Sequence, residues 1–511
     1  MRMDIGRKWL ATAGLLLALT LAVGACGTSL TDTNQNPNEP TDVPAANILS
    51  GATVELGNTE WASFWHMSLW STWSQLLSEI QYPDEDRYRV RLSTLDGYWN
   101  DLYDRAKDFS IIEQKGANGE GPNVEAVGKI MKSYTFHILT DAWGPVPYSE
   151  ALQLDQGGSS TPAYDGGATI YAGMLQDLTT AANEIDAGSD PFGSNDVIYG
   201  GDMQKWQRFA NSLRLRFAMR LSSTDNGTAQ SEAEAAIAAG TFESNADNAV
   251  LSYQAQAPNR NPVYVNGLTR DDHAPSETML AMMRNWQDPR MKIYAQPAPN
   301  SSASDPVSVR YLGASPGQST QPVVSAGGSL NDIARIGTFW RSDPGAPMYF
   351  MTYAEVEFLK AEAALRGYNV GSGDAQSHYE AGIQASMDQY GISQDSIDNY
   401  MSQSGVAWDP LASTGVHMQQ IATQKWMSLY MGDAVEAYAE IRRLGLPDIA
   451  PGPDASNVNS GAIPERIVYP PLEPSLNGSS WQAAVSQYFG GSDDMSGQLF
   501  WDPNPTDPPS P

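Results

Sequence analysis

Cysteine is nearly missing from this chain of 511 residues, which has a single one at position 26. An internal disulfide is therefore excluded, and stability has to come from packing. Basic residues are also scarce, because 30 Lys and Arg stand against 59 Asp and Glu, a formal net charge of −29. Such a chain repels phosphate backbones, so nucleic acid is not expected as a partner.

Common catalytic signatures are missing as well. The five histidines lie far apart without an H-E-x-x-H pair, and no G-x-x-x-x-G-K-[ST] loop occurs. Residues 313–317 match G-x-S-x-G, but Pro316 follows Ser315 where a helix would have to begin. A zinc enzyme, a phosphate-loop enzyme and a serine hydrolase are thus disfavoured, and no cofactor is expected.

The N-terminus has the layout of an export signal. Basic residues precede an apolar run from Trp9 to Val23, which at about 15 residues is short for a membrane span of roughly 20. The run ends in small residues before Cys26 and resembles a bacterial lipobox. We therefore predict a signal peptide over residues 1–25 and a lipid anchor on Cys26, since several acyl chains hold a protein on a membrane.

Composition suggests where the folded part begins and ends. Residues 26–45 are polar and rich in Pro and Asn, which favours a flexible tether. Residues 502–511 are proline-rich and polar, which favours a disordered tail. No linker interrupts residues 46–501, so one folded domain is expected there.

Apolar residues recur at helical spacing through most of that domain. Helix faces are predicted for Val124 to Ile138, Tyr171 to Ile185, Phe209 to Leu221, Thr352 to Arg366 with a stop at Gly367, and Met418 to Ile441. Residues 258–347 differ, because Gly, Pro, Ser and Asn recur there around one helical piece, Ser276 to Trp286. The fold class is therefore all-α with long irregular loop insertions, and such insertions are usually either functional or disordered.

Five aromatic residues lie within one short segment: Trp61, Phe64, Trp65, Trp70 and Trp73. One inward helix stripe cannot hold them all, so some rings are expected to face outward and stack on a sugar or a peptide. Trp340, flanked by Arg335 and Arg341, offers a second platform. The predicted ligand-binding residues are Trp61, Trp65, Trp70, Trp73, Trp340, Arg270, Asp272 and Arg341.

Two acidic clusters leave another chemistry open. Asp84, Glu85 and Asp86, or Asp271 and Asp272, supply the carboxylates that a glycoside hydrolase or a calcium site would need. Solvated loop charge is the simpler interpretation of both clusters.

Several segments together resemble the SusD/RagB family of outer-membrane lipoproteins. They are Thr140 to Ala151, Lys205 to Arg216, Met351 to Leu359, Gln424 to Trp426, Ala437 to Arg443 and Ile463 to Arg466. The resemblance implies a tetratricopeptide-like scaffold of helical pairs whose loops bind a nutrient oligomer. It also implies a partner, a TonB-dependent transporter of the SusC type, and a lipid-anchored position on the outer membrane that faces the cell exterior.

We accordingly expect capture of an oligosaccharide or a peptide and its delivery to the transporter, without covalent chemistry. A surface glycoside hydrolase and a non-binding helical scaffold are the alternatives. The aromatic residues favour binding over scaffolding, and the missing catalytic signatures disfavour the hydrolase.

Overall fold

A computed structural model describes residues 43–455 and 461–503. Cys26, most of the expected tether and residues 504–511 lie outside the described residues. The residues from Ala45 onward form one compact unit, and the structural description below concerns that unit. Ala45 and Asp502 are both buried in it, although the sequence assigns them to the flanking segments.

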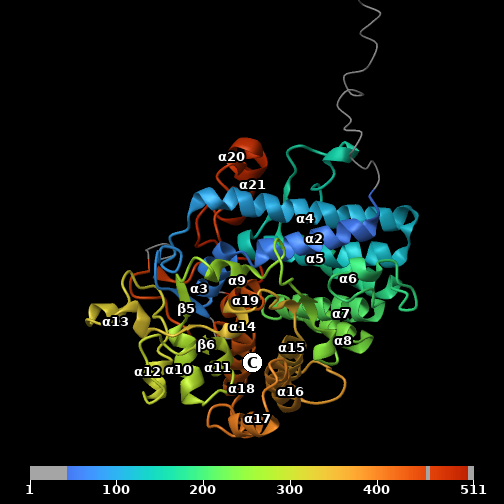
Figure 1. The fold of residues 1–511 in the computed structure, drawn as a ribbon. Helices are drawn as coiled ribbons and strands as arrows, with labels where there is room; N and C mark the ends of the chain where they lie inside the picture. The colour runs from blue at the N-terminus through green and yellow to red at the C-terminus, as the bar shows by residue number, and fades with distance from the viewer. Residues whose placement is uncertain (1–42, 456–460, 504–511) are drawn as a thin grey trace, which may run out of the picture. The chain divides into compact units, whose positions relative to one another are not determined.

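Long helices make most of the fold, as predicted. In the N-terminal half, consecutive helices pack side by side in a stack (Figure 1). These are α2 (Ala45–Glu60), α4 (Leu95–Lys115), α5 (Pro122–Trp143), α6 (Gly167–Glu184), α7 (Met203–Arg220) and α8 (Asn226–Ala239). The later helices are α15 (Tyr353–Leu365), α16 (Ala375–Asp388), α17 (Gln394–Met401), α18 (Thr414–Ser428), α19 (Ala434–Leu444), α20 (Glu473–Leu476) and α21 (Gly478–Tyr488).

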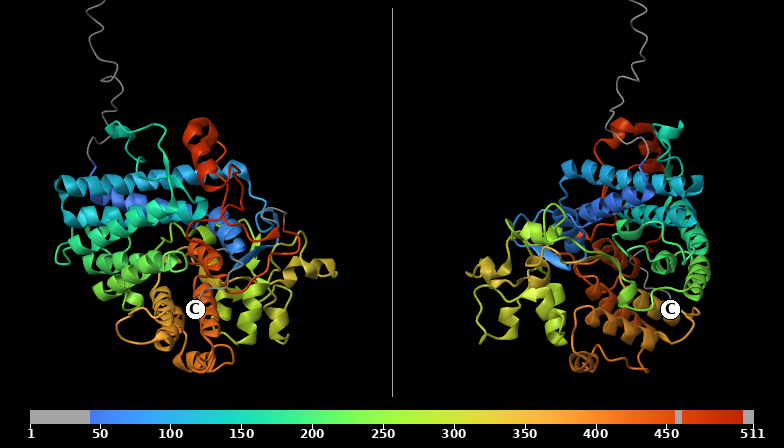
Figure 2. Two further views of the ribbon diagram at one scale, coloured as in Figure 1. Left: turned by 180° about the vertical axis from the view of Figure 1, so that it is seen from behind. Right: turned by 45° about the vertical axis from the view of Figure 1, so that its right-hand side comes forward.

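Short elements make up much of the rest of the fold, and those of residues 276–325, drawn in yellow-green to yellow, lie on the opposite side of the molecule from α6, α7 and α8 (Figure 2). The helical ones are η1 (Ser63–Trp70), α3 (Ser71–Trp73), α9 (Pro262–Gly267), α10 (Glu277–Asn285), α11 (Met291–Tyr294), α12 (Val307–Arg310), α13 (Pro322–Ser325) and α14 (Thr338–Arg341). Antiparallel strand pairs join distant segments: β1 (Leu77–Glu79) with β5 (His273–Pro275), β2 (Val146–Pro147) with β3 (Tyr164–Asp165), β4 (Ala249–Leu251) with β8 (Met348–Met351), and β6 (Ala295–Gln296) with β7 (Arg335–Ile336). The predicted helical piece in the irregular region is α10.

The α5 helix shows how sequence sets a helix and its packing. Pro122 lies in its first turn, where no backbone donor is lost, and the predicted apolar face is buried. A Cβ at Gly128 would lie 2.4 Å from the backbone nitrogen of Glu113 in α4. Glycine therefore allows the close contact between α4 and α5.

The helix α15 has the predicted start and stop. The Thr352 side chain accepts the backbone N–H of Glu355, and Gly367 takes the left-handed conformation with φ of 84°. In a full capping box the carboxylate of Glu355 would also accept the backbone N–H of Thr352. Here that carboxylate is paired with Arg216 from α7 instead.

The single helix predicted from Met418 to Ile441 is wrong. The structure has α18 and α19 with a turn between them, where Met431 has a φ of 55°. The side chain of Asp433 then accepts the N–H of Glu436 and starts α19 anew. Helical spacing continues across the turn because both helices are buried on several sides.

A buried network of charged side chains joins α7, α15, α18 and α19. Arg216 donates to both oxygens of Glu355 at 2.7 Å and to Asp433 at 2.9 Å. Arg443 pairs with Glu362 at 2.6 Å, and Lys425 pairs with Glu436 at 2.7 Å. The family-like segments of α7, α15, α18 and α19 thus supply the interior of the fold.

Among the described residues, no helix combines the length and the apolar character that crossing a membrane requires.

Candidate functional site

An open cleft of about 460 Å³ lies where η1, β1, α9 and β5 meet. Its lining residues include Phe64 and Ser68 from η1, Glu79 from β1, Tyr82, Asp84, Glu85 and Arg91 from the following loop, Asn266 and Arg270 from α9 and its C-terminal extension, and Asp272 and His273 at β5. We call it the Tyr82 cleft. It combines an accessible aromatic ring with both charged groups and hydrogen-bonding side chains.

Tyr82 is the most accessible aromatic residue in the described part of the chain, at 66% exposed. The guanidinium of Arg270 lies 5.8 Å from the centre of its ring, and Arg270 also faces Asp272 at 3.6 Å. A flat ring beside a cation and a carboxylate can stack on a sugar ring while the charged groups bond to its hydroxyls.

Arg91 closes the other side of the cleft. It holds both carboxylate oxygens of Glu85, at 2.7 and 3.1 Å, and its guanidinium lies 4.7 Å from the ring centre of Phe64. The carboxylate of Glu85 is thus already paired, which leaves the exposed Asp84 and the loosely paired Asp272 to accept bonds from a ligand.

The floor of the cleft is uncharged near neutral pH. Burial, and next the charge of Glu85, raise the pKa of Glu79 to about 8. Burial, and next Arg341, lower the pKa of His273 to about 4. The 3.6 Å approach of these two side chains is therefore a contact between neutral groups.

Ser68, His273 and Glu79 do not form a catalytic triad. The hydroxyl of Ser68 lies 2.8 Å from Nε2 of His273, and the carboxyl of Glu79 approaches the same nitrogen. A triad needs the acid on the opposite ring nitrogen, but Nδ1 of His273 is buried without a hydrogen-bond partner. In the described part of the chain, no group of three His, Cys, Asp or Glu side chains is placed to hold a metal ion.

Two predicted ligand-binding residues, Arg270 and Asp272, line the cleft. Arg341 does not, but it donates to Val263 O at 3.0 Å and to the side-chain oxygen of Asn266 at 2.9 Å. It therefore fixes α9 and leaves the amide N–H₂ of Asn266 available as a donor.

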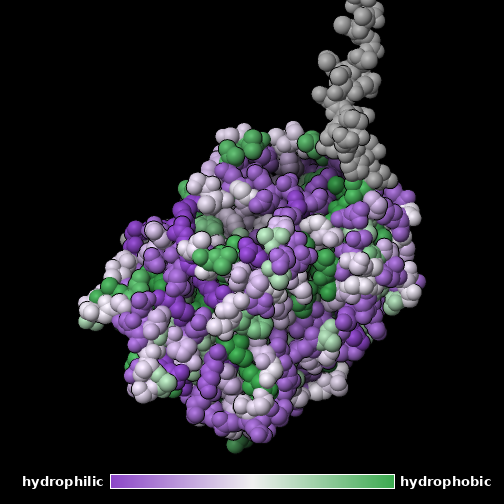
Figure 3. Space-filling model, viewed as in Figure 1, coloured by the Kyte–Doolittle hydropathy of each residue, from purple (hydrophilic) through white to green (hydrophobic). Residues whose placement is uncertain are grey.

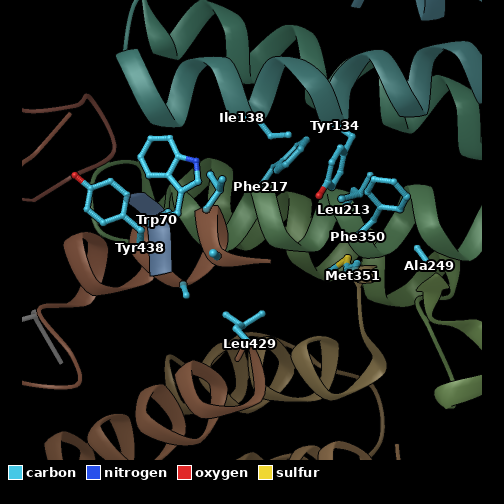
Figure 4. Close-up of a cluster of buried hydrophobic side chains, with 14 of the residues drawn as sticks. Trp70, Tyr134, Ile138, Leu213, Phe217, Ala249, Phe350, Met351, Leu429 and Tyr438 are labelled. Carbon is cyan, nitrogen blue, oxygen red and sulfur yellow. The ribbon is translucent and has the colours of Figure 1, made fainter. Parts of the chain in front are cut away.

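The expected platform of tryptophans is wrong. Trp61, Trp70 and Trp73 are fully buried, and Trp65 and Trp340 are 7% and 1% exposed. Trp70 lies in the core beside Tyr438 (Figure 4). The physical reason is that η1 and α3 pack against α2, α9, α19 and β1. These elements cover the tryptophan side chains, and η1 reaches the cleft only through Ser63, Phe64 and Ser68.

Sequence reasoning missed Tyr82, Arg91 and Glu79. The cluster at Asp84 to Asp86 was a signal, because Tyr82 and Pro83 directly precede it. Figure 3 shows that one face of the molecule is mainly hydrophilic, with small scattered apolar patches. A small polar cleft with one exposed ring is therefore hard to find by hydropathy alone.

Comparison with known proteins identifies the family. A model of the SusD-like family, described as starch-binding and associating with the outer membrane, matches residues 37–470. The chain belongs to the SusD-like family. Members are binding proteins, so this SusD-like protein is a binding protein and not an enzyme.

Solved structures agree in fold. A chitin-binding protein is 30% identical with a TM-score of 0.78, and the match covers 90% of this chain and 100% of that one. A chitin-binding SusD homologue from Flavobacterium johnsoniae is 28% identical with a TM-score of 0.77, over 90% and 100%. A SusD-like protein from Bacteroides thetaiotaomicron is 24% identical with a TM-score of 0.77, over 90% and 99%. The predicted tetratricopeptide-like helical fold is thus confirmed, while no curated protein matches the chain.

Proposed function

We propose that this SusD-like protein captures an oligosaccharide in the Tyr82 cleft at the surface of the outer membrane. The observation that carries the proposal is the exposed ring of Tyr82 beside Arg270 and Asp272 in an open cleft. The starch-binding description of the family and the chitin-binding description of two similar structures favour a glycan over a peptide.

The lipid anchor and the transporter partner are proposed from membership of the SusD-like family. Lipid on Cys26 anchors the protein, and a SusC-like TonB-dependent transporter receives the oligosaccharide. The acidic chain, with its net charge of −29, favours a neutral glycan over an anionic one.

The test is direct titration of the protein lacking residues 1–26 with chitin oligosaccharides, malto-oligosaccharides and an unrelated peptide. We expect binding to one of the glycans. Tyr82→Ala should weaken it by roughly 5- to 30-fold, which corresponds to about 1–2 kcal/mol of stacking.

Tyr488→Ala is the matched control, because Tyr488 is also an exposed tyrosine, at 39%, but does not line the cleft. It should bind as well as the unchanged protein. Failure to bind any glycan, or equal effects of the two substitutions, would contradict the proposal.

A further inference from the structure

One wall of the Tyr82 cleft is formed by the end of α9. Asn266 and Arg270 both line the cleft, and the backbone N–H of Arg270 donates to Asn266 O at 2.9 Å, as in a further helical turn. Side chains four positions apart on a helix lie on the same face. The two side chains therefore stand next to each other on this wall, which we call the α9 wall.

The chemistry of Arg341 fixes which way round the amide of Asn266 lies. Nη1 of Arg341 donates to Oδ1 of Asn266 at 2.9 Å. A guanidinium has N–H donors and no acceptor, so only the oxygen end of the amide can face it. Within the part of the chain that the structure describes, the Nδ2 group of Asn266 makes no hydrogen bond. Both of its N–H donors are thus free to bond to a ligand.

The backbone of α9 makes room for Arg341. The guanidinium also donates to Val263 O at 3.0 Å, one turn before Asn266. A Cβ at Gly267 would lie 2.9 Å from both Cδ and Nη1 of Arg341. Glycine at this position therefore leaves the space that the arginine occupies when it bonds to the amide oxygen.

Neighbouring carboxylates do not compete for the guanidinium of Arg341 by direct contact. Asp271 pairs with Arg335 at 2.6 Å, and Asp272 faces Arg270 at 3.6 Å. Both act on Arg341 through the longer-range field. Among residues 43–455 and 461–503, Arg341 therefore has no carboxylate partner, and its Nη2 is buried without a hydrogen bond. The amide oxygen is the side-chain acceptor that it holds.

We propose that Arg341 is a positioning residue for the ligand, which makes the α9 wall a wall of hydrogen-bond donors. The wall then selects the edge of an oligosaccharide that presents acceptor oxygens, such as hydroxyl lone pairs, ring oxygens or an acetamido carbonyl. Asp84, exposed on the loop of Tyr82, can accept bonds from hydroxyls on another edge. The inference rests on the proposed function, since the ligand is taken to bind in this cleft.

The first test reverses the polarity of the wall. Asn266→Asp replaces the two donors by a second acceptor oxygen in a side chain of the same shape. Its affinity for chitin oligosaccharides or malto-oligosaccharides, measured by titration, should fall about tenfold or more, because the acceptor oxygens of the ligand then meet a carboxylate. Thr269→Asp is the control, since Thr269 is exposed beside the same helix end and does not line the cleft. It adds the same charge and should leave the affinity unchanged; equal losses in the two variants would overturn the inference.

The second test separates positioning of the amide from support of the fold. Arg341→Met lets the amide turn, so the affinity should fall about threefold to tenfold. In a protein that already carries Asn266→Ala, the same substitution should change the affinity by less than about twofold, because no amide is left to orient. A role of Arg341 only in holding α9 would lower the affinity equally in both backgrounds, and that result would overturn the inference.

Arg284→Met is the matched control for the second test. Arg284 is also a half-buried arginine that holds an irregular segment, because it donates to Tyr311 O at 2.6 Å. It does not line the cleft. Its replacement should leave the affinity unchanged, and a loss as large as that of Arg341→Met would count against a specific action on the amide.

A third measurement needs no ligand. Asn266→Asp places a carboxylate beside the guanidinium of Arg341, so its urea denaturation midpoint should be at least as high as that of the unchanged protein. Together with Arg341→Met, the same substitution should lower the midpoint, since the new carboxylate then lacks its cation. Equal shifts in the two backgrounds would overturn the inference even if glycans bind. The expected shifts without binding of any glycan would support the bond to Arg341 and contradict the proposed function.

Discussion

Replacing Arg216 by Met should show how much the buried charge network contributes to stability. Arg216 is fully buried and donates to Glu355, Asp433 and the backbone oxygen of Phe350. The substitution leaves two buried carboxylates without their nearest cation. Breaking a buried pair in this way costs about 3–5 kcal/mol, a large fraction of the roughly 5–15 kcal/mol that holds a protein folded.

The loss should depend on pH. Burial raises the pKa of Glu355 and of Asp433, while Arg216 opposes the rise. Without Arg216 both pKa values rise further, so both groups take up protons more readily as the pH falls. The destabilisation should therefore be smaller at about pH 5 than at about pH 8.

Urea denaturation followed by tryptophan fluorescence measures the free energy of unfolding. Arg214→Met is the matched control, since Arg214 lies on the same helix and pairs with the partly exposed Glu232; it should cost less than about 1 kcal/mol. Adding Glu355→Met to Arg216→Met should recover part of the loss, because apolar side chains of similar volume often replace a buried pair at little cost. A loss no larger than that of Arg214→Met would refute this reasoning.

Other substitutions test the core, the buried histidines and the anchor. Trp70→Ala should cost roughly 3–5 kcal/mol of folding free energy, because the ring is fully buried, and an unchanged denaturation midpoint would contradict its burial. Burial, with smaller contributions from neighbouring charges, lowers the pKa of His66 and of His137 to about 3. The unfolded state therefore binds more protons than the folded state, and the free energy of unfolding should fall as the pH drops below about 6.5. Each histidine contributes about 2 kcal/mol of that loss at about pH 5, and His66→Gln should flatten the pH dependence of the denaturation midpoint. Cys26→Ala should move the protein out of the membrane fraction, and firm retention in that fraction would contradict the proposed lipid anchor.

Much of the helical scaffold could be predicted because its signals are local. The periodic residues of α5, the cap at Thr352 and the stop at Gly367 each depend on neighbours within a few positions. The break between α18 and α19 was missed because residues on both sides are buried, so the apolar spacing continues through the turn.

The cleft was predicted only in part, since its residues come together through long-range pairing. Arg270 and Asp272 reach it because β5 pairs with β1, almost two hundred positions earlier in the chain. The exposure of the tryptophans was predicted wrongly. A sequence shows that a helix is apolar all round, but it does not show whether neighbouring elements enclose that helix. Tyr82 lies in a polar loop and belongs to no periodic pattern of apolar residues.

The indole N–H groups of the core have a consequence for how the chain folds. Trp61 donates to Gly432 O, Trp426 to Ser74 O, and Trp143 to Val468 O, across 371, 352 and 325 positions of the chain. The N-terminal helices therefore cannot complete their core until the last quarter of the chain is available. Contacts this distant in sequence slow folding. Under the proposed anchoring at the outer membrane this delay is useful, because a chain that remains unfolded until its end has emerged can still be threaded through a translocation channel.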